Sequence, residues 1–159
     1  MMRVNFLAKV ILFLAVVAFV MGTVFIAQGV MRNSELKEAM RVEHITLGIA
    51  DAETEGQVID SLAEAQEAGD TIREHRRGIA TSYEDLLGGG RYDPTDTEQL
   101  TYAQALNLEN YLYLAVVAFG LITVIMATGG FMIVTAVALG ITGVALLRVS
   151  REYSFKTKT

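Results

Sequence analysis

The chain has 159 residues, of which 52% are hydrophobic and 19% are charged, so it is one domain-sized unit with more apolar material than a soluble domain usually carries. It contains no cysteine, which excludes disulfides, thiolate nucleophiles and metal sites built on cysteine. The net charge of −5 divides into +2 for residues 1–31, −10 for residues 32–110 and +3 for residues 111–159, and this acidic middle argues against a nucleic-acid partner, which needs clustered Lys and Arg.

The first apolar tract covers residues 10–31, without a charge, between Lys9 and Arg32. A helix of this length crosses a hydrocarbon core of about 30 Å, so residues 1–31 are predicted to be an N-terminal transmembrane anchor. A cleaved signal peptide is the alternative. The tract exceeds the usual apolar region of such a peptide, and no small-x-small pair ending in alanine follows it.

The second apolar tract covers residues 111–147, also without a charge. As one helix it would be roughly 55 Å long, nearly twice the thickness of the hydrocarbon core. Gly129 and Gly130 lie near its middle and allow the backbone conformations of a tight turn. We therefore predict a transmembrane helical hairpin with arms at residues 111–127 and 131–147, and a re-entrant hairpin is the alternative.

The predicted fold is an all-α membrane protein with three transmembrane helices, a helical acidic loop at residues 32–110 and a basic tail at residues 148–159. Four side chains at the ends of the hairpin are candidate interfacial anchors: Tyr111, Tyr113, Arg148 and Arg151. The charges that flank the spans conflict, since Arg3 and Lys9 favour an internal N-terminus while the basic tail favours an internal C-terminus. We expect the bacterial plasma membrane, with residues 32–110 extracytoplasmic.

The acidic loop contains three Ser/Thr-x-x-Glu capping boxes: Ser61 with Glu64, Thr81 with Glu84, and Thr95 with Glu98. They predict helices over residues 61–77 and 82–87, the latter stopped by residues 88–90, and a third helix that starts near Asp96 and continues into the membrane. Strand-like alternation occurs only at residues 45–49. Apolar side chains are too few for an independent core, so the loop is expected to pack on the ends of the spans, on a second copy or on another protein.

A catalytic or metal site would have to start from His44 and His75, each preceded by a glutamate. Two histidines and two carboxylates form a metal site when the fold brings them together. The sequence offers no Glu-x-x-His or His-x-x-x-His spacing, and the three glycines at residues 88–90 are not followed by the lysine of a phosphate-binding loop. We therefore expect no catalytic residue, no cofactor and no metal.

Small residues recur along the apolar tracts at spacings that allow close helix approach. The candidate helix-packing positions in the first tract are Ala8, Ala15, Ala18, Gly22 and Gly29, and those in the second tract are Ala136, Gly140 and Gly143. The spans carry no charged residue, which argues against a proton or ion pathway formed by this chain alone.

Two stretches carry a resemblance to a known group of proteins: residues 65–94, with the run IREHRRGIATSYEDLLGGGRYDP, and residues 101–119. They resemble small bacterial membrane proteins that have one anchor helix, an acidic soluble loop and a C-terminal apolar hairpin. The resemblance implies this architecture and assigns no functional residue.

We expect a non-catalytic accessory or scaffold subunit that packs its helices in the lipid bilayer and docks its acidic loop on a membrane protein partner or on itself. A membrane-anchored sensor that binds a ligand or cation through the −10 charge is one alternative. A metal-dependent enzyme is the other.

Overall fold

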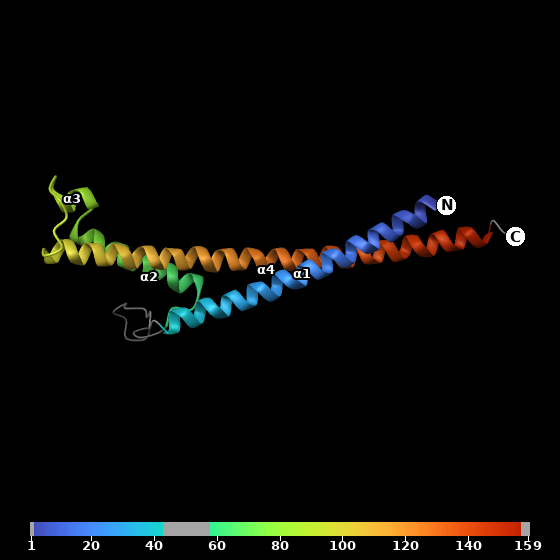
Figure 1. The fold of residues 1–159 in the computed structure, drawn as a ribbon, viewed down its shortest axis with the longest axis horizontal. Helices are drawn as coiled ribbons and strands as arrows, with labels where there is room; N and C mark the ends of the chain where they lie inside the picture. The colour runs from blue at the N-terminus through green and yellow to red at the C-terminus, as the bar shows by residue number, and fades with distance from the viewer. Residues whose placement is uncertain (1, 43–57, 157–159) are drawn as a thin grey trace. The chain divides into compact units, whose positions relative to one another are not determined.

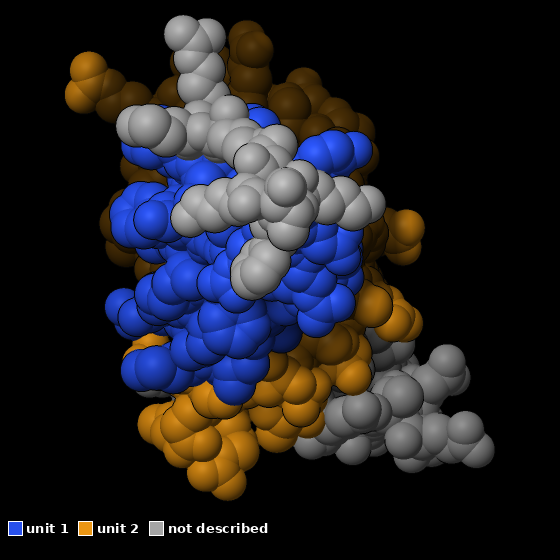
Figure 2. All heavy atoms as spheres, turned by 90° about the vertical axis from the view of Figure 1, so that its right-hand side faces the viewer, with its two compact units in different colours: residues 1–32, 122–159 blue, residues 33–121 orange. Residues whose placement is uncertain are grey.

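A computed structural model describes residues 2–42 and 58–156 of the chain, and its described part consists of four α-helices (Figure 1). These are α1 (Met2–Val42), α2 (Leu62–Ile79), α3 (Tyr83–Leu87) and α4 (Thr97–Lys156). The chain divides into two compact units, coloured separately in Figure 2. Residues 1–32 and 122–159 form the first unit, and residues 33–121 form the second, so α1 and α4 each contribute to both.

In the first unit α1 and α4 lie side by side and antiparallel, with both ends of the chain at the same end of the pair (Figure 1). The buried residues of α1 are Ala8, Ala15, Gly22 and Gly29, and those of α4 are Ile122, Gly129, Ala136 and Gly143. Both sets recur every seven residues, the interval that keeps one seam of a helix facing its partner.

The remaining surface of this pair is strongly apolar. Phe6, Phe13, Phe131, Val134 and Ile141 are all at least two-thirds exposed. The two helices α1 and α4 are long and apolar enough to cross a membrane. An all-helical chain with two candidate spans is therefore what the described residues show.

The predicted hairpin at residues 128–130 is wrong, because α4 continues as a helix through all three residues. Positive φ angles occur only at Gly88 and Gly89 among the described glycines, so Gly129 and Gly130 do not form a turn. The structure has two candidate spans among the described residues, so the three-span count is not confirmed. The physical reason is that a glycine also serves where two backbones approach closely, and Gly129 is used in this way.

In the second unit, side chains cap the helices. The Ser61 hydroxyl oxygen accepts from the Glu64 backbone N–H of α2, and the Glu64 carboxylate accepts from the Asp60 N–H. The other two predicted boxes are displaced by one residue, with Ser82 capping α3 and Asp96 capping α4. Gly88, in the left-handed region at φ 53°, ends α3.

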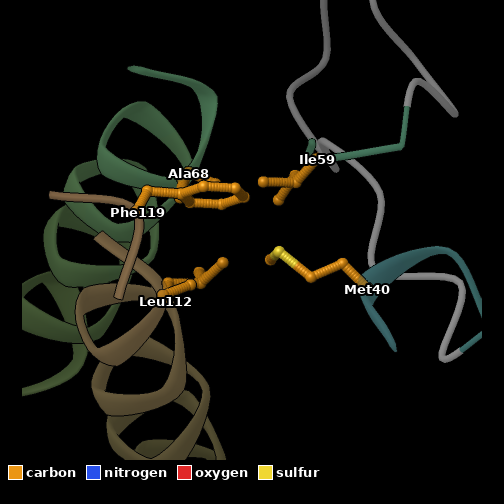
Figure 3. Packing of buried hydrophobic residues seen from close by; sticks show 7 residues of the cluster. Met40, Ile59, Ala68, Leu112 and Phe119 are labelled. Atoms are coloured by element: carbon orange, nitrogen blue, oxygen red, sulfur yellow. The ribbon is translucent and has the colours of Figure 1, made fainter. Parts of the chain in front are cut away.

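The core of the second unit joins α1, α2 and α4. Met40 of α1 and Ile59 point towards Leu112, Ala68 and Phe119 (Figure 3), and Ala65 and Ala115 complete the buried cluster. The acidic segment thus packs on residues 112–119, which the sequence assigned to a membrane span. The acidic segment was expected to pack on the ends of the spans, on a second copy or on another protein. The observed packing is on the ends of the two long helices. The alternation at residues 45–49 lies outside the described residues.

Candidate functional site

The helices α1 and α4 approach each other closely at Gly22 and Gly129. A Cβ atom built on Gly22 would lie 2.7 Å from the Gly129 carbonyl oxygen, and one built on Gly129 would lie 2.8 Å from the Gly22 carbonyl oxygen. The neighbouring Ile133 and Ile26 side chains are equally close, each at 2.9 Å. Each glycine therefore has no room for even a methyl group, and the pair brings two backbones into direct contact.

The other predicted packing residues differ in their burial. Ala8, Ala15, Gly29, Ala136 and Gly143 are buried in the contact between α1 and α4, since Gly143 faces Ala8 and Leu12 while Gly29 faces Met126. Ala18 is half-buried. Gly140, in contrast, has no atom within 4 Å of a built Cβ and lies outside the contact, as does Gly130 of the predicted turn.

A buried ion pair fastens α2 to α4 in the second unit. Arg76 Nε donates to Glu109 Oε2 at 2.7 Å, and the two residues are only 8% and 7% exposed. The Arg76 guanidinium also donates to the Tyr102 hydroxyl and lies over the Tyr102 ring, 4.9 Å from its centroid. Since burying a charge without a partner is costly, these contacts are what make the buried arginine tolerable.

A second, more exposed set of contacts continues this arrangement. Arg73 Nε donates to the other Glu109 oxygen at 3.2 Å, and Arg73 also pairs with Asp70 at 3.3 Å. The Tyr113 hydroxyl donates to Asp70, and the Arg73 guanidinium lies 4.5 Å from the centroid of the Tyr113 ring. Residues 70, 73 and 76 share one face of α2, so three side chains of this helix contact three of α4. We call these six residues the clamp: Asp70, Arg73, Arg76, Tyr102, Glu109 and Tyr113.

The clamp also fixes the charge state of its central carboxylate. Burial raises the pKa of Glu109, but the hydrogen bonds from Arg76 and Arg73 lower it by more, so the pKa lies below its usual value. Among the described residues, every buried side-chain nitrogen and oxygen has a hydrogen-bond partner. The clamp is therefore a saturated structural contact that leaves no buried polar atom aimed at a ligand.

The predicted interfacial anchors differ in their surroundings. Tyr111 is exposed, as are Arg148 and Arg151 at the other end of the tract. Tyr113 instead belongs to the clamp, where its ring and hydroxyl contact α2. Tyr113 thus contacts protein on one side, and its assignment to the membrane interface stays a prediction.

The candidate metal residues are not brought together in the described part of the chain. His75 lies on the exposed side of α2, whereas His44 lies outside the described residues. No three His, Asp or Glu residues among those described are placed to hold a metal ion.

Two further signals in the sequence correspond to these contacts. Counting back in sevens from Gly143 and Ala136 reaches Gly129, which identifies this glycine as a packing position. In the acidic segment, three of the seven basic residues lie at positions 73–77, and Glu109 is the last charge before the second apolar tract. Such a cluster of arginines in an acidic segment is a signal for a specific carboxylate partner.

Comparison with known proteins adds no relative to this description. No protein-family model, no curated protein and no solved structure matches the chain.

Proposed function

We propose that the protein is a non-catalytic membrane subunit that inserts through two antiparallel helices and presents a helical acidic module for docking to a partner protein. The observation that carries the proposal is the clamp, because Arg76 and Glu109 fix α2 on a helix that continues into the apolar pair. Because α2 is already held in place, the binding of a partner does not carry the entropy cost of ordering this helix.

The lengths of the apolar segments support two spans. In α1 the uncharged residues 10–31 extend about 33 Å, and in α4 the uncharged residues 122–147 extend about 39 Å, against a hydrocarbon core of ~30 Å. Residues 111–121 are accounted for separately, because Leu112, Ala115 and Phe119 pack in the core of the second unit. The long apolar tract therefore forms one membrane span and part of the core of the second unit. It does not require a second crossing of the membrane.

The distribution of charge then gives one consistent orientation. Two spans leave both termini on the same side of the membrane. The two terminal segments contain one acidic residue, Glu152, and six basic residues: Arg3, Lys9, Arg148, Arg151, Lys156 and Lys158. Basic residues that flank spans prefer the cytoplasm, so both termini are cytoplasmic and the −10 segment is extracytoplasmic. The conflict of the three-span prediction disappears, because the N-terminus and the tail now favour the same side.

The outer side of α2 supplies the candidate docking surface. A shallow depression of about 410 Å³ runs along it, lined by Ala63, Gln66, Glu67, Asp70, Thr71 and Glu74. It carries three carboxylates and no basic side chain, so the partner chemistry that fits is a basic protein surface. Asp70 is shared with the clamp, which ties the depression to the attachment of α2.

Accessibility of single cysteines tests the topology, since the natural chain has none to remove. We expect a cysteine at Arg91 to react with a membrane-impermeant maleimide on intact cells, and one at Arg151 to react only after permeabilisation. A cysteine at Gly130 should stay unreactive, because it lies within hydrocarbon. Reaction of the Arg151 variant on intact cells would overturn the proposed orientation.

Photocrosslinking from the full-length protein in native membranes tests the docking. A photoreactive residue at Glu67 or Glu74 should give one adduct of defined mass, and the exposed Arg91 position serves as the control. The adduct should be lost in the Arg76→Met variant, because α2 is then released from α4. The same adducts at Arg91, or none at Glu67 and Glu74, would contradict the docking role.

A further inference from the structure

Two shallow apolar hollows in the first unit meet at Gly140. The first, of about 300 Å³, lies between α1 and α4, and its walls include Val16 and Phe19 of α1 and Val137 of α4. The second, of about 580 Å³, continues along α4 as far as Arg148. Gly140 lines both hollows, so together they form one continuous groove, which we call the Gly140 groove.

Gly140 keeps this groove open. Among the described residues, no atom lies within 4 Å of a Cβ built on Gly140, whereas a Cβ built on Gly143 would lie 2.7 Å from the Leu12 side chain. The sequence predicted both glycines as helix-packing positions, and only Gly143 contacts the other helix of the pair. The small size of Gly140 therefore leaves room beside the helix pair.

The groove has the depth of one leaflet of a bilayer. In the two spans of the proposed function, Phe19 lies near the middle of the uncharged residues 10–31 and Val137 lies near the middle of the uncharged residues 122–147. From Val137 to Arg148 the helix rises about 17 Å, against about 15 Å for half of the hydrocarbon core. Arg148 is the first charged residue after the apolar tract. The groove thus runs from near the bilayer centre to the surface on the side of the termini.

We propose that the Gly140 groove binds one anionic phospholipid, with an acyl chain along its apolar part and the phosphate paired with Arg148. The inference rests on the membrane insertion of the proposed function. The apolar walls match a hydrocarbon chain, which has no hydrogen-bonding group to satisfy. The Arg148 side chain is exposed, and its guanidinium has the planar donor geometry that fits a phosphate.

The charge at this end of the helices favours a lipid over a second copy of the chain as the occupant. The terminal segments, residues 1–9 and 148–159, contain six basic residues and one acidic residue. A second copy would bring the same positive excess to Arg148, whereas an anionic headgroup neutralises it. The proposed orientation also places Arg148 at the cytoplasmic leaflet, where the anionic phospholipids are concentrated.

Native mass determination of the full-length protein with added phosphatidylglycerol or phosphatidylcholine tests the headgroup contact. We expect the natural protein to bind phosphatidylglycerol about fivefold more tightly, the factor that one basic residue near an anionic lipid contributes. Arg148→Gln should bind the two lipids equally. The matched control Arg151→Gln, which replaces an arginine outside the groove, should keep the preference. Excess inorganic phosphate should not displace the lipid, and displacement would overturn the acyl-chain contact.

A second pair of variants tests the apolar part of the groove. Gly140→Leu fills the groove and should weaken the binding of both lipids about tenfold, which corresponds to the loss of roughly two methylene contacts. The control is Gly130→Leu, because Gly130 is equally open, lies on the same helix and lines neither hollow. Helical circular dichroism of both variants should equal that of the natural protein.

Three results would overturn the inference. They are equal binding of the two lipids by the natural protein, equal weakening by Gly130→Leu and Gly140→Leu, and loss of the headgroup preference in Arg151→Gln. A second chain retained in place of lipid would overturn it as well. Failure of the natural protein to remain in alkaline-washed membranes would instead overturn the proposed membrane insertion.

Discussion

Adjacent glycines in α4 provide a sharp test of how α1 and α4 pack. In Gly129→Ala the new methyl group would lie 2.8 Å from the Gly22 carbonyl oxygen, whereas ordinary contact begins at 3.4 Å, so the helices must separate by about 0.6 Å. Overpacking of this kind costs about 1–3 kcal/mol. In Gly130→Ala the methyl group meets nothing within 4 Å. Both variants gain the same helix propensity, up to about 1 kcal/mol, so their difference isolates the packing cost.

We therefore expect Gly129→Ala to be about 1–3 kcal/mol less stable than Gly130→Ala. The measurement is the free energy of unfolding in mixed micelles titrated with SDS, read from energy transfer between labels on cysteines at Val16 and Val137. Gly22→Ala should behave like Gly129→Ala, because the two glycines face each other. Equal stability of the Gly129 and Gly130 variants would refute direct contact of the two backbones.

The remaining predictions concern the second unit. Arg76→Met should destabilise the packing of α2 by about 3–5 kcal/mol, because it leaves the Glu109 carboxylate buried with fewer partners. The control variant Arg77→Met replaces an exposed arginine and should change the stability little. Urea titration of the full-length protein measures both variants. Since the pKa of Glu109 is lowered by folding, its contribution to stability is present above the pKa of an unfolded glutamate and is lost as the pH falls through the folded value. Hydrogen exchange of the α2 backbone amides, measured at decreasing pH, should reveal this loss of stability. The Glu109→Gln variant should not show the pH dependence. A soluble fragment of residues 33–110 should show little helical circular dichroism, while residues 33–121, which include the core side chains of α4, should show much more. Equal helicity would mean that the acidic segment folds without residues 111–121 of α4.

How much of the fold the sequence predicts is clearest at the helix ends. Ser61 caps α2 and Gly88 ends α3 as their local sequences require, because capping depends on residues within one turn. The two displaced caps show the limit of such patterns, since Ser82 and Asp96 stand one residue after the threonines of the predicted boxes and have side chains that serve equally well.

By itself the sequence determined that the chain is helical, that two tracts are apolar and uncharged, and that small residues recur every seven positions along the first tract. Local preference and periodicity act within one helix, so they are legible without knowledge of its neighbours. Tertiary structure decided what each face contacts. It showed that Gly129 contacts the backbone of Gly22, although the sequence suggested a turn at this position. It also showed that Leu112 and Phe119 pack against α2, although the sequence suggested a membrane span there. It also decided the pairing of Arg76 with Glu109, because contacts between residues far apart in the chain depend on the packing of whole helices and leave no periodic trace in the sequence.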